Sequence, residues 1–452
     1  MKTLLIILLM VSSALAGPTQ TDWSGGPGNV GPMAGWTDGF DTAIDASWRA
    51  VPGQVSLSST GLATGVAHQI AGFYSGAFGV EAVDIDNDGD IDVIGVAESA
   101  RKVTIWYNDG QNPPSFTEDV IATVYVAAAA VVATDFNDDG LLDLVVSAGT
   151  ITGKLTAFLN EGGSPATWTT QLIDSQWGEA WEIGVADVDS DGNMDVVGTS
   201  LSQDSVVWWR NDGAAPIGWT RLTVDNTFDA AHSARGADLD GDGHTDIVGC
   251  GTVSEEVAWW KNSGTEPITW TKYVMDDAFL GGRSVRIADL DDDGDPDVVA
   301  GGFNGRMKWW RNDGGMPVNW TPQVADSTMS AIHNVQIADM DGDGLLDLIG
   351  ADYQGNALAW WENGGGPTPT WTRYKPVYNL NRPLAVDVGD VDGDGALELI
   401  GSSNGFGQIV WYDVTSFVPE GTLTSPILDR GADAPLEMEW TADTPVGTCL
   451  LY

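Results

Sequence analysis

Short apolar runs separated by polar turns follow one another along nearly the whole chain, without the three-to-four-residue spacing of an amphipathic helix. In one typical stretch, alternating small and apolar residues at 285–288 precede an acidic loop, and a second apolar run follows at 298–300. An aromatic pair at 309–310, a turn at 312–315 and a Trp-Thr segment starting at Trp320 complete the stretch. This order predicts four short β-strands.

The same stretch recurs at a nearly constant interval. Its acidic loop has the pattern Asp-x-Asp-x-Asp-Gly-x-x-Asp, with an Asn in the second copy and a final Glu in the seventh. The copies begin at Asp84, Asp135, Asp187, Asp238, Asp289, Asp339 and Asp390, with spacings of 50 to 52 residues. Four antiparallel strands in a repeat of this length are typical of a propeller blade, and seven blades can close a ring. We therefore predict an all-β, seven-bladed β-propeller; an open β-solenoid is the alternative.

The ends of the repeat region indicate how the ring closes. The last unit has its aromatic strand at Trp411-Tyr412 but no Trp-Thr segment after it. The segment His68-Gln69-Ile70 precedes the first loop at the place where other units carry their outer strand. We expect the propeller to occupy residues 66–415, with residues 66–71 completing the seventh blade and leaving no open blade edge.

The first residues are typical of a signal peptide. A positive start at Lys2, an apolar run from Leu4 to Val11 and the small-x-small triplet Ala14-Leu15-Ala16 predict removal of residues 1–16. The apolar run is too short to span a bilayer. We expect an exported protein that is secreted, on the cell surface or periplasmic, where Ca²⁺ is usually abundant.

The remaining segments flank the propeller. Residues 17–65 read as an N-terminal linker or extension with a possible strand at 54–57. Residues 416–452 resemble the opening strands of a C-terminal β-sandwich-like module, incomplete where the sequence stops at Tyr452. The two cysteines, Cys250 and Cys449, are too few for a disulfide scaffold.

The charge of the chain is strongly unbalanced. With 65 Asp and Glu against 19 Lys and Arg, the formal net charge is −46. Such a surface repels phosphate backbones and anionic lipids, so nucleic-acid and anionic-membrane partners are excluded. Because 43% of the residues are hydrophobic and 21 are Trp, the chain is predicted to fold, with cations neutralising part of this charge.

The acidic loops place four side-chain oxygens, at positions 1, 3, 5 and 9, around one point. Hard oxygen ligands in a flexible loop favour Ca²⁺, and Gly at position 6 permits the turn that brings position 9 back. Ordinary Asp-Gly hairpin turns are the alternative, but four carboxylates repel one another without a cation. The predicted ligands are Asp84, Asp86, Asp88 and Asp92; Asp135, Asn137, Asp139 and Asp143; Asp187, Asp189, Asp191 and Asp195; Asp238, Asp240, Asp242 and Asp246; Asp289, Asp291, Asp293 and Asp297; Asp339, Asp341, Asp343 and Asp347; and Asp390, Asp392, Asp394 and Glu398. The second loop, with Asn137, carries one charge fewer and is expected to bind most weakly.

These loops, together with the Trp-Trp strands, resemble the FG-GAP repeat, also described as the VCBS repeat, of integrin α-chain heads and exported bacterial proteins. The resemblance covers roughly residues 66–415 and implies a seven-bladed propeller with about seven structural Ca²⁺ ions in hairpin loops on one face. Similar propellers serve in adhesion, as lectins and as accessory domains of polysaccharide-degrading enzymes. This chain departs from the family's name motif, because Trp-Trp or Trp-Tyr pairs replace a Phe-Gly…Gly-Ala-Pro signature.

A group of cations is expected near one mouth of the ring. Residues six and three positions before the acidic loops of blades 3 to 6 include Trp181, His232, Arg235, Arg283, Arg286 and His333. They are candidates for recognising a carboxylate or an acidic sugar, with Trp181 stacking on the ring. The alternative is that they are loop residues paired with neighbouring carboxylates. The Trp pairs likewise have two readings, as core between blades or as a platform that stacks sugars.

No nucleophile elbow, Walker loop or His-Glu-x-x-His motif is present, so catalysis has little support in the sequence. The favoured function is an extracellular binding or adhesion module for a glycan or protein ligand. The alternative is a polysaccharide-active enzyme of the lyase type, or its accessory carbohydrate-binding domain. The pattern makes no prediction of oligomeric state.

Overall fold

The structure is a computed structural model that describes residues 54–56, 67–150, 153–414 and 422–424. Within these residues it contains strands and turns but no helix, which confirms the predicted all-β class. The chain divides into two compact units, Thr64–Pro419 and a second that joins Met1–Ala63 with Glu420–Tyr452. The predicted signal peptide (1–16), most of the extension (17–65) and most of the C-terminal module (416–452) lie outside the described residues.

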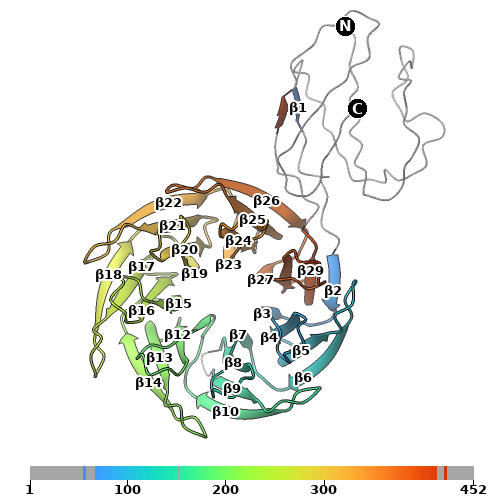
Figure 1. Cartoon of the computed structure of the whole chain (residues 1–452), viewed down its shortest axis with the longest axis horizontal. Helices are drawn as coiled ribbons and strands as arrows, with labels where there is room; N and C mark the ends of the chain where they lie inside the picture. The colour runs from blue at the N-terminus through green and yellow to red at the C-terminus, as the bar shows by residue number, and fades with distance from the viewer. Residues whose placement is uncertain (1–53, 57–66, 151–152, 415–421, 425–452) are drawn as a thin grey trace, which may run out of the picture. The chain divides into compact units, whose positions relative to one another are not determined.

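The larger unit holds seven four-stranded antiparallel sheets among its described residues, arranged as the blades of a ring (Figure 1). Blade 1 contains β3 (Ala77–Val83), β4 (Asp92–Ala97), β5 (Lys102–Asn108) and β6 (Phe116–Ala122). Blade 2 contains β7 (Ala128–Thr134), β8 (Asp143–Ala148), β9 (Leu155–Asn160) and β10 (Trp168–Asp174). Blade 3 contains β11 (Ile183–Ala186), β12 (Asp195–Ser200), β13 (Ser205–Asn211) and β14 (Trp219–Asp225). Blade 4 contains β15 (Ala231–Ala237), β16 (Asp246–Gly251), β17 (Val257–Asn262) and β18 (Trp270–Asp276).

Blades 5 to 7 continue the ring. Blade 5 contains β19 (Gly282–Ala288), β20 (Asp297–Gly302), β21 (Met307–Asn312) and β22 (Trp320–Asp326). Blade 6 contains β23 (Ile332–Ala338), β24 (Asp347–Asp352), β25 (Ala357–Asn363) and β26 (Trp371–Tyr378). Blade 7 contains β27 (Pro383–Gly389), β28 (Glu398–Ser403), β29 (Gln408–Tyr412) and, from the N-terminal side, β2 (Ala67–Ala71).

The ring closes as the sequence predicts. Strand β2 pairs antiparallel with β29, with His68 opposite Trp411, and their rings stack with centroids 4.1 Å apart. The innermost strands follow one another around the axis, and β27 of the last blade contacts β3 of the first. Closure of this kind removes the free blade edge that would otherwise be open to pairing with another chain.

The core lies between adjacent blades and is built by the aromatic pairs. Trp208 belongs to a buried cluster with residues of blade 4, whereas its neighbour Trp209 belongs to a cluster with residues of blade 2. Consecutive residues of a strand point to opposite faces, and both faces of a blade are covered. Both side chains are almost fully buried. The reading of the Trp pairs as core is therefore correct for this blade.

A glycine on the second strand of a blade makes room for the aromatic ring. At Gly198 of β12, a Cβ would lie 2.8 Å from the ring of Trp209. The equivalent Gly95 of β4 would bring a Cβ to 2.7 Å from Trp106. Any larger residue at these positions would push the aromatic strand away from its neighbour, so the glycines set the packing distance within the blade.

The smaller unit contributes one described strand pair. Strand β1 (Gln54–Ser56) pairs antiparallel with β30 (Thr422–Thr424), with Gln54 opposite Thr424.

Candidate functional site

The acidic loops join the first and second strands of each blade. In blade 4, β15 ends at Ala237, the loop begins at Asp238, and its ninth residue, Asp246, is the first residue of β16. Because this register repeats in every blade, all seven loops lie at the same end of the strands and hence on one face of the ring. Gly243, the sixth residue, has a φ of +86°, a conformation that glycine adopts without strain.

Backbone amides hold the first carboxylate of the loop in a fixed orientation. In blade 4, Asp238 Oδ1 accepts the amide of Asp242 at 3.1 Å, and Asp238 Oδ2 accepts that of Gly243 at 2.8 Å. Asp246 Oδ1 accepts the amide of Asn262 at 2.7 Å. The first and ninth carboxylates are thus positioned by the backbone, as expected of a preformed ligand cage.

In at least five of the seven loops, three carboxylates converge. Their oxygen atoms lie within 4.8 Å of one another and come from positions 1, 3 and 9; the described groups include Asp84/Asp86/Asp92, Asp187/Asp189/Asp195, Asp238/Asp240/Asp246, Asp289/Asp291/Asp297 and Asp339/Asp341/Asp347. Position 5 stands outside these groups. Its carboxylate accepts the amide of position 7, as Asp242 does from His244 at 3.0 Å.

Several of these carboxylates are buried without the hydrogen bonds that burial requires. The side chain of Asp291 is 1% exposed, and both of its oxygens lack a hydrogen-bond partner within the described residues. The same holds for one oxygen each of Asp86 and Asp390. A buried carboxylate without partners costs several kcal/mol, and a bound cation offsets this cost. The donor set, with oxygens only, fits a hard cation such as Ca²⁺.

The ninth carboxylate is the most deeply buried member of each cage. Burial raises the pKa of Asp246 and of Asp297 to about 7, and that of Asp195 to about 8, against the ordinary 3.8, although backbone hydrogen bonds oppose the rise. Groups with these pKa values hold protons near neutral pH unless a cation replaces them. Metal binding to the loops is therefore expected to release protons.

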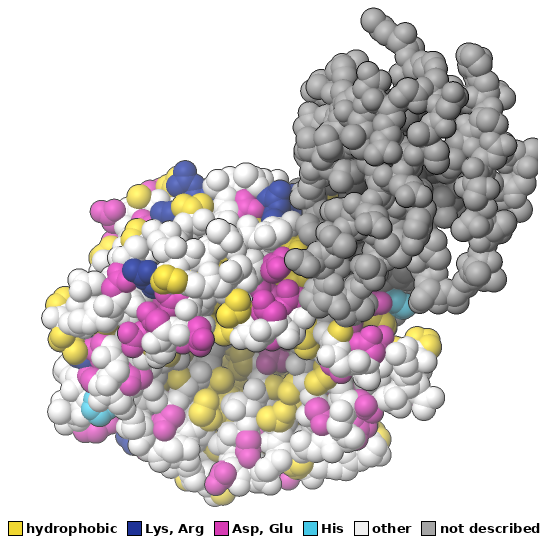
Figure 2. All heavy atoms as spheres, turned by 45° about the horizontal axis from the view of Figure 1, so that its top comes forward, with side chains coloured by type: hydrophobic (Ala, Val, Ile, Leu, Met, Phe, Trp, Pro, Cys, Tyr) yellow, Lys and Arg dark blue, Asp and Glu magenta, His cyan; other side chains and the backbone are white. Residues whose placement is uncertain are grey.

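Away from these loops, the inner strands enclose a cavity on the axis of the ring. Its volume is about 80 Å³, and all six residues predicted to bind a ligand line it: Trp181, His232, Arg235, Arg283, Arg286 and His333. A water needs roughly 10–15 Å³ on this measure, so the cavity holds several waters or one small polar group. Figure 2 shows the hollow at the centre of the ring and a described surface with many Asp and Glu side chains but few Lys and Arg.

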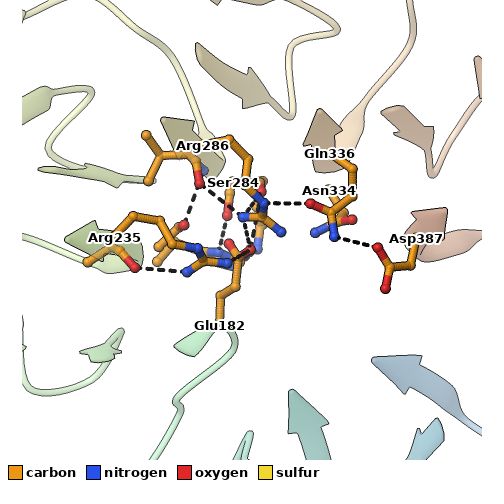
Figure 3. Close-up of polar contacts among 12 residues, drawn as sticks. Glu182, Arg235, Ser284, Arg286, Asn334, Gln336 and Asp387 are labelled. Atoms are coloured by element: carbon orange, nitrogen blue, oxygen red, sulfur yellow. Dashed lines mark hydrogen bonds and ion pairs between the residues drawn. The ribbon is translucent and has the colours of Figure 1, made fainter. Parts of the chain in front are cut away.

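Two of the cavity's arginines are already paired with a carboxylate. Arg235 Nη2 lies 2.6 Å and Arg286 Nη1 lies 2.5 Å from Glu182 Oε1 (Figure 3). Burial alone would raise the pKa of Glu182, but the two guanidinium groups outweigh it and lower the pKa to about 2. The alternative prediction, that these residues pair with neighbouring carboxylates, is therefore correct for Arg235 and Arg286.

The polar chain continues across the cavity from Arg286. Its Nε donates to Gln336 Oε1 at 2.8 Å, and Gln336 Nε2 donates to Asp387 Oδ1 at 3.0 Å (Figure 3). Burial and the charge of Asp387 raise the pKa of the adjacent Glu81 to about 8. Side chains from blades 3 to 7 thus form one connected chain across the channel.

A second layer contains the histidines and Arg283. His232 Nδ1 lies 2.7 Å from the carbonyl oxygen of Arg283, so this nitrogen carries the proton and Nε2 accepts Arg283 Nη1 at 2.9 Å. Burial and the charge of Arg283 lower the pKa of His333 to about 4. Burial, the charge of Arg283 and the nearby His333 lower the pKa of His232 well below its ordinary value. Both imidazoles are therefore neutral at pH 7.

Arg283 differs from the other two arginines because it has no carboxylate partner within the described residues. Its guanidinium lies 4.8 Å from the ring centroid of Phe303, and its Nε is buried without a hydrogen-bond partner among those residues. Trp181 lies across the same cavity, stacked on Phe78 with centroids 5.2 Å apart. The cavity thus combines an unneutralised cation with an aromatic wall.

Glu182 is a cavity residue that the sequence reasoning missed. The comparison between blades used positions six and three before each loop, and Glu182 stands five before Asp187. Blade 3 departs from the others, because β11 begins only at Ile183 and position three is Gly184. A Cβ on Gly184 would lie 3.0 Å from Arg235 Cδ, so the missing side chain makes room for this arginine. The signal available in the sequence was Gly184 itself, because the other six blades have a larger residue at this position.

The sequence reasoning also missed a ring of asparagines at the ends of the third strands. Asn262 Nδ2 donates at 3.0 Å both to Thr245 O of its own blade and to Val188 O in the acidic loop of the preceding blade. Equivalent bonds are made by Asn108, Asn160, Asn211, Asn312 and Asn363. The signal was the Asn that follows each aromatic strand of blades 1 to 6.

The fold and the loops together define a seven-bladed propeller with one acidic loop per blade. The chain belongs to the family of FG-GAP-like repeats, which confirms the predicted resemblance. The family pattern matches residues 84–146, 135–198, 187–249, 238–300, 289–350 and 339–401.

Two crystal structures of BBS1N in complex with ARL6DN, soaked with mercury and with lead, are similar in fold. The first has a TM-score of 0.50 at 14% identity and covers 78% of this chain and 99% of that chain. The second has a TM-score of 0.49 at 13% identity and covers 77% and 97%. No curated protein sequence matches the chain. No helix in the part of the chain that the structure describes has the length and hydropathy to span a membrane.

Proposed function

We propose that this protein is an exported binding module in which Ca²⁺ in the acidic loops stabilises the propeller, while the central cavity recognises an acidic group of an extracellular glycan. The export part rests on the signal-peptide pattern of residues 1–16. N-terminal sequencing of the exported protein should begin at Gly17.

One observation carries the choice of ligand. Arg283 is a partly buried cation without a carboxylate partner within the described residues, in a chain whose net charge is −46. A carboxylate, as the one small polar group that the cavity holds, would pair with the guanidinium of Arg283, while the rest of the sugar packs against Trp181. Charge-assisted hydrogen bonds of this kind are the strong ones, and they favour an acidic sugar over a neutral one.

The histidines favour binding over lyase chemistry. Elimination from a uronate needs a base that accepts a proton at neutral pH, and a pKa of about 4 makes His333 a weak proton acceptor. Incubation with polygalacturonate should therefore produce no absorbance from unsaturated sugar. Growth of that absorbance would replace the binding proposal with a lyase.

The test uses oligogalacturonate, after a glycan array has ranked acidic and neutral sugars with Ca²⁺ present. Arg283→Gln should weaken oligogalacturonate binding at least about tenfold in calorimetry, because a charge-assisted hydrogen bond is lost. Arg306→Gln is the matched control, since Arg306 is exposed in the β20–β21 turn and does not line the cavity. Binding that survives Arg283→Gln undiminished would refute this site.

A further inference from the structure

One register position next to each acidic loop varies in charge while the loops themselves repeat. It is the residue before the Asn that ends the third strand in blades 1 to 6, or before the Asp that follows it in blade 7. Its side chain reaches the loop of its own blade in blades 3 to 5. In blade order its occupants are Tyr107, Leu159, Arg210, Lys261, Arg311, Glu362 and Tyr412. Three blades thus have a cation here and one has a carboxylate.

In blades 3 and 4 the cation lies against the metal-binding carboxylates. Lys261 Nζ contacts the Oδ2 atoms of both Asp240 and Asp242, and the Asp240 side chain is fully buried. Arg210 Nε lies 2.6 Å from Asp189 Oδ2, whose side chain is 1% exposed. These carboxylates occupy positions 3 and 5 of their loops. A divalent ion must compete with the ammonium or guanidinium group for their oxygens.

Blade 5 is an intermediate case. Arg311 Nε lies 4.0 Å from Asp291 Oδ2, but Nη2 lies 2.5 Å from Asp313 Oδ1 and Nη1 donates to Pro367 O at 2.7 Å. These contacts hold the guanidinium away from the cage. The contact of Arg311 with Asp291 is therefore longer than that of Arg210 with Asp189 in blade 3, at 4.0 Å against 2.6 Å.

Blade 6 has the opposite charge at this position. Glu362 Oε2 accepts a hydrogen bond from the hydroxyl of Tyr374 at 2.5 Å, and Oε1 takes no part in this bond. Glu362 precedes the final Asn of β25, which is the position from which Lys261 reaches the loop in blade 4. The sixth loop thus gains a negative charge where the fourth gains a positive one.

We propose that this position sets the divalent-ion affinity of each loop, so that loops 3 and 4 carry a built-in competing cation and loop 6 binds most tightly. The affinity of oxygen cages for Ca²⁺ follows the number of ligand charges. A unit charge about 4 Å from the ion changes the affinity by at least about fivefold even in water, and by more in a partly buried site. Loops 3 and 4, rather than the Asn137 loop, are then the weakest. This inference rests on the proposed binding of calcium.

The experiment measures Ca²⁺ bound per full-length chain by equilibrium dialysis over a range of free Ca²⁺. Lys261→Gln removes the competing cation and should tighten one weak site about tenfold, and Lys261→Glu, which copies blade 6, should tighten it further. Arg210→Gln should do the same independently in blade 3. Glu362→Gln keeps an acceptor for Tyr374 and should weaken the tightest site about tenfold.

Arg306→Gln removes the same charge far from any loop and should leave the binding curve unchanged. Melting in saturating Ca²⁺ verifies that each variant folds. The proposal is overturned if neither Lys261→Gln nor Arg210→Gln shifts a site, or if Arg306→Gln shifts the curve as much as they do. A wild-type chain that binds no Ca²⁺ at all would instead refute the calcium part of the proposed function.

Discussion

At the scale of single residues, the buried charges of this protein fall into two kinds. In the channel, Glu182 compensates Arg235 and Arg286, and the three groups form a satisfied network. In the loops, carboxylates such as Asp291 face one another with oxygens that lack hydrogen-bond partners among the described residues. The first arrangement is complete without a ligand, whereas the second leaves carboxylates that a bound cation would compensate. Arg283 adds a third case, a cation without a carboxylate.

Removing the charge of Glu182 should destabilise the propeller. Glu182→Gln leaves Arg235 and Arg286 buried and uncompensated, and we expect a loss of about 3 kcal/mol in the free energy of unfolding at pH 7, measured by chemical denaturation. Because the pKa of Glu182 is lowered to about 2 from 4.5, its charge stabilises the fold above pH 4.5 and progressively less below. The difference between the variant and the wild type should shrink as the pH falls toward 2.

The exposed Glu161 provides the control, since Glu161→Gln removes the same charge from a surface turn. We expect its unfolding free energy to stay within about 0.5 kcal/mol of the wild type. Equal stability of Glu182→Gln and the wild type would mean that the buried ion pairs are not needed to close the channel.

The residues of the cavity could be predicted only in part. Comparing equivalent positions between blades identified all six predicted cavity residues, because the inner strands of a propeller share one register. The same comparison missed Glu182, because blade 3 replaces regular strand with an irregular segment before Ile183. A carboxylate neutralises Arg235 and Arg286 but not Arg283. This difference depends on distances between blades, and the spacing of residues along the chain does not reveal those distances.

At the scale of strands, blades 1 to 6 are each attached to the preceding blade by an asparagine. Asn262 ends β17, donates to Val188 O of the preceding loop and also accepts the amide of Gly264 at 2.9 Å. The bond from Asn262 to Val188 O places the second residue of an acidic loop at a fixed distance from the next blade. The acidic loops are therefore coupled mechanically to the ring.

Breaking one of these connections should cost stability without changing the strand order. Asn262→Ala leaves the buried carbonyls of Val188 and Thr245 without this donor, and we expect a loss of about 1–3 kcal/mol in the free energy of unfolding. Asn262→Asp keeps the acceptor for Gly264 but not the donors, so it separates the two contributions. If both variants unfold at the same denaturant concentration as the wild type, the asparagines do not hold the blades together.

The strands themselves were the most predictable element. The alternation of small and apolar residues, the aromatic pairs and the Trp-Thr segments correspond to the first, third and outer strands of the blades. The convergent carboxylates come from positions 1, 3 and 9 of the loops, and the prediction that position 5 is also a ligand stays a prediction. Which oxygens converge depends on how each loop curves, and the one-dimensional pattern does not specify that curvature.

At the scale of the whole molecule, closure of the ring determines where the negative charge of the acidic loops gathers. The final unit lacks one strand, and β2 from the N-terminal side supplies it, so the ring is closed by segments more than 300 residues apart. A closed ring places all acidic loops on one face, which concentrates much of the net charge of −46 there. Without cations this face would repel itself and favour opening of the ring.

The most direct test of the account is the melting temperature of the full chain in excess Ca²⁺ and in EDTA. When free Ca²⁺ is at a hundred times the Kd, each bound ion adds about 2.7 kcal/mol to the free energy of unfolding. Loss of several ions should therefore lower the melting temperature by about 10 °C or more. Re-addition of Ca²⁺ beyond the EDTA should restore it. A melting temperature that is the same in EDTA and in Ca²⁺ would contradict the claim that metal ions in the acidic loops hold this propeller together.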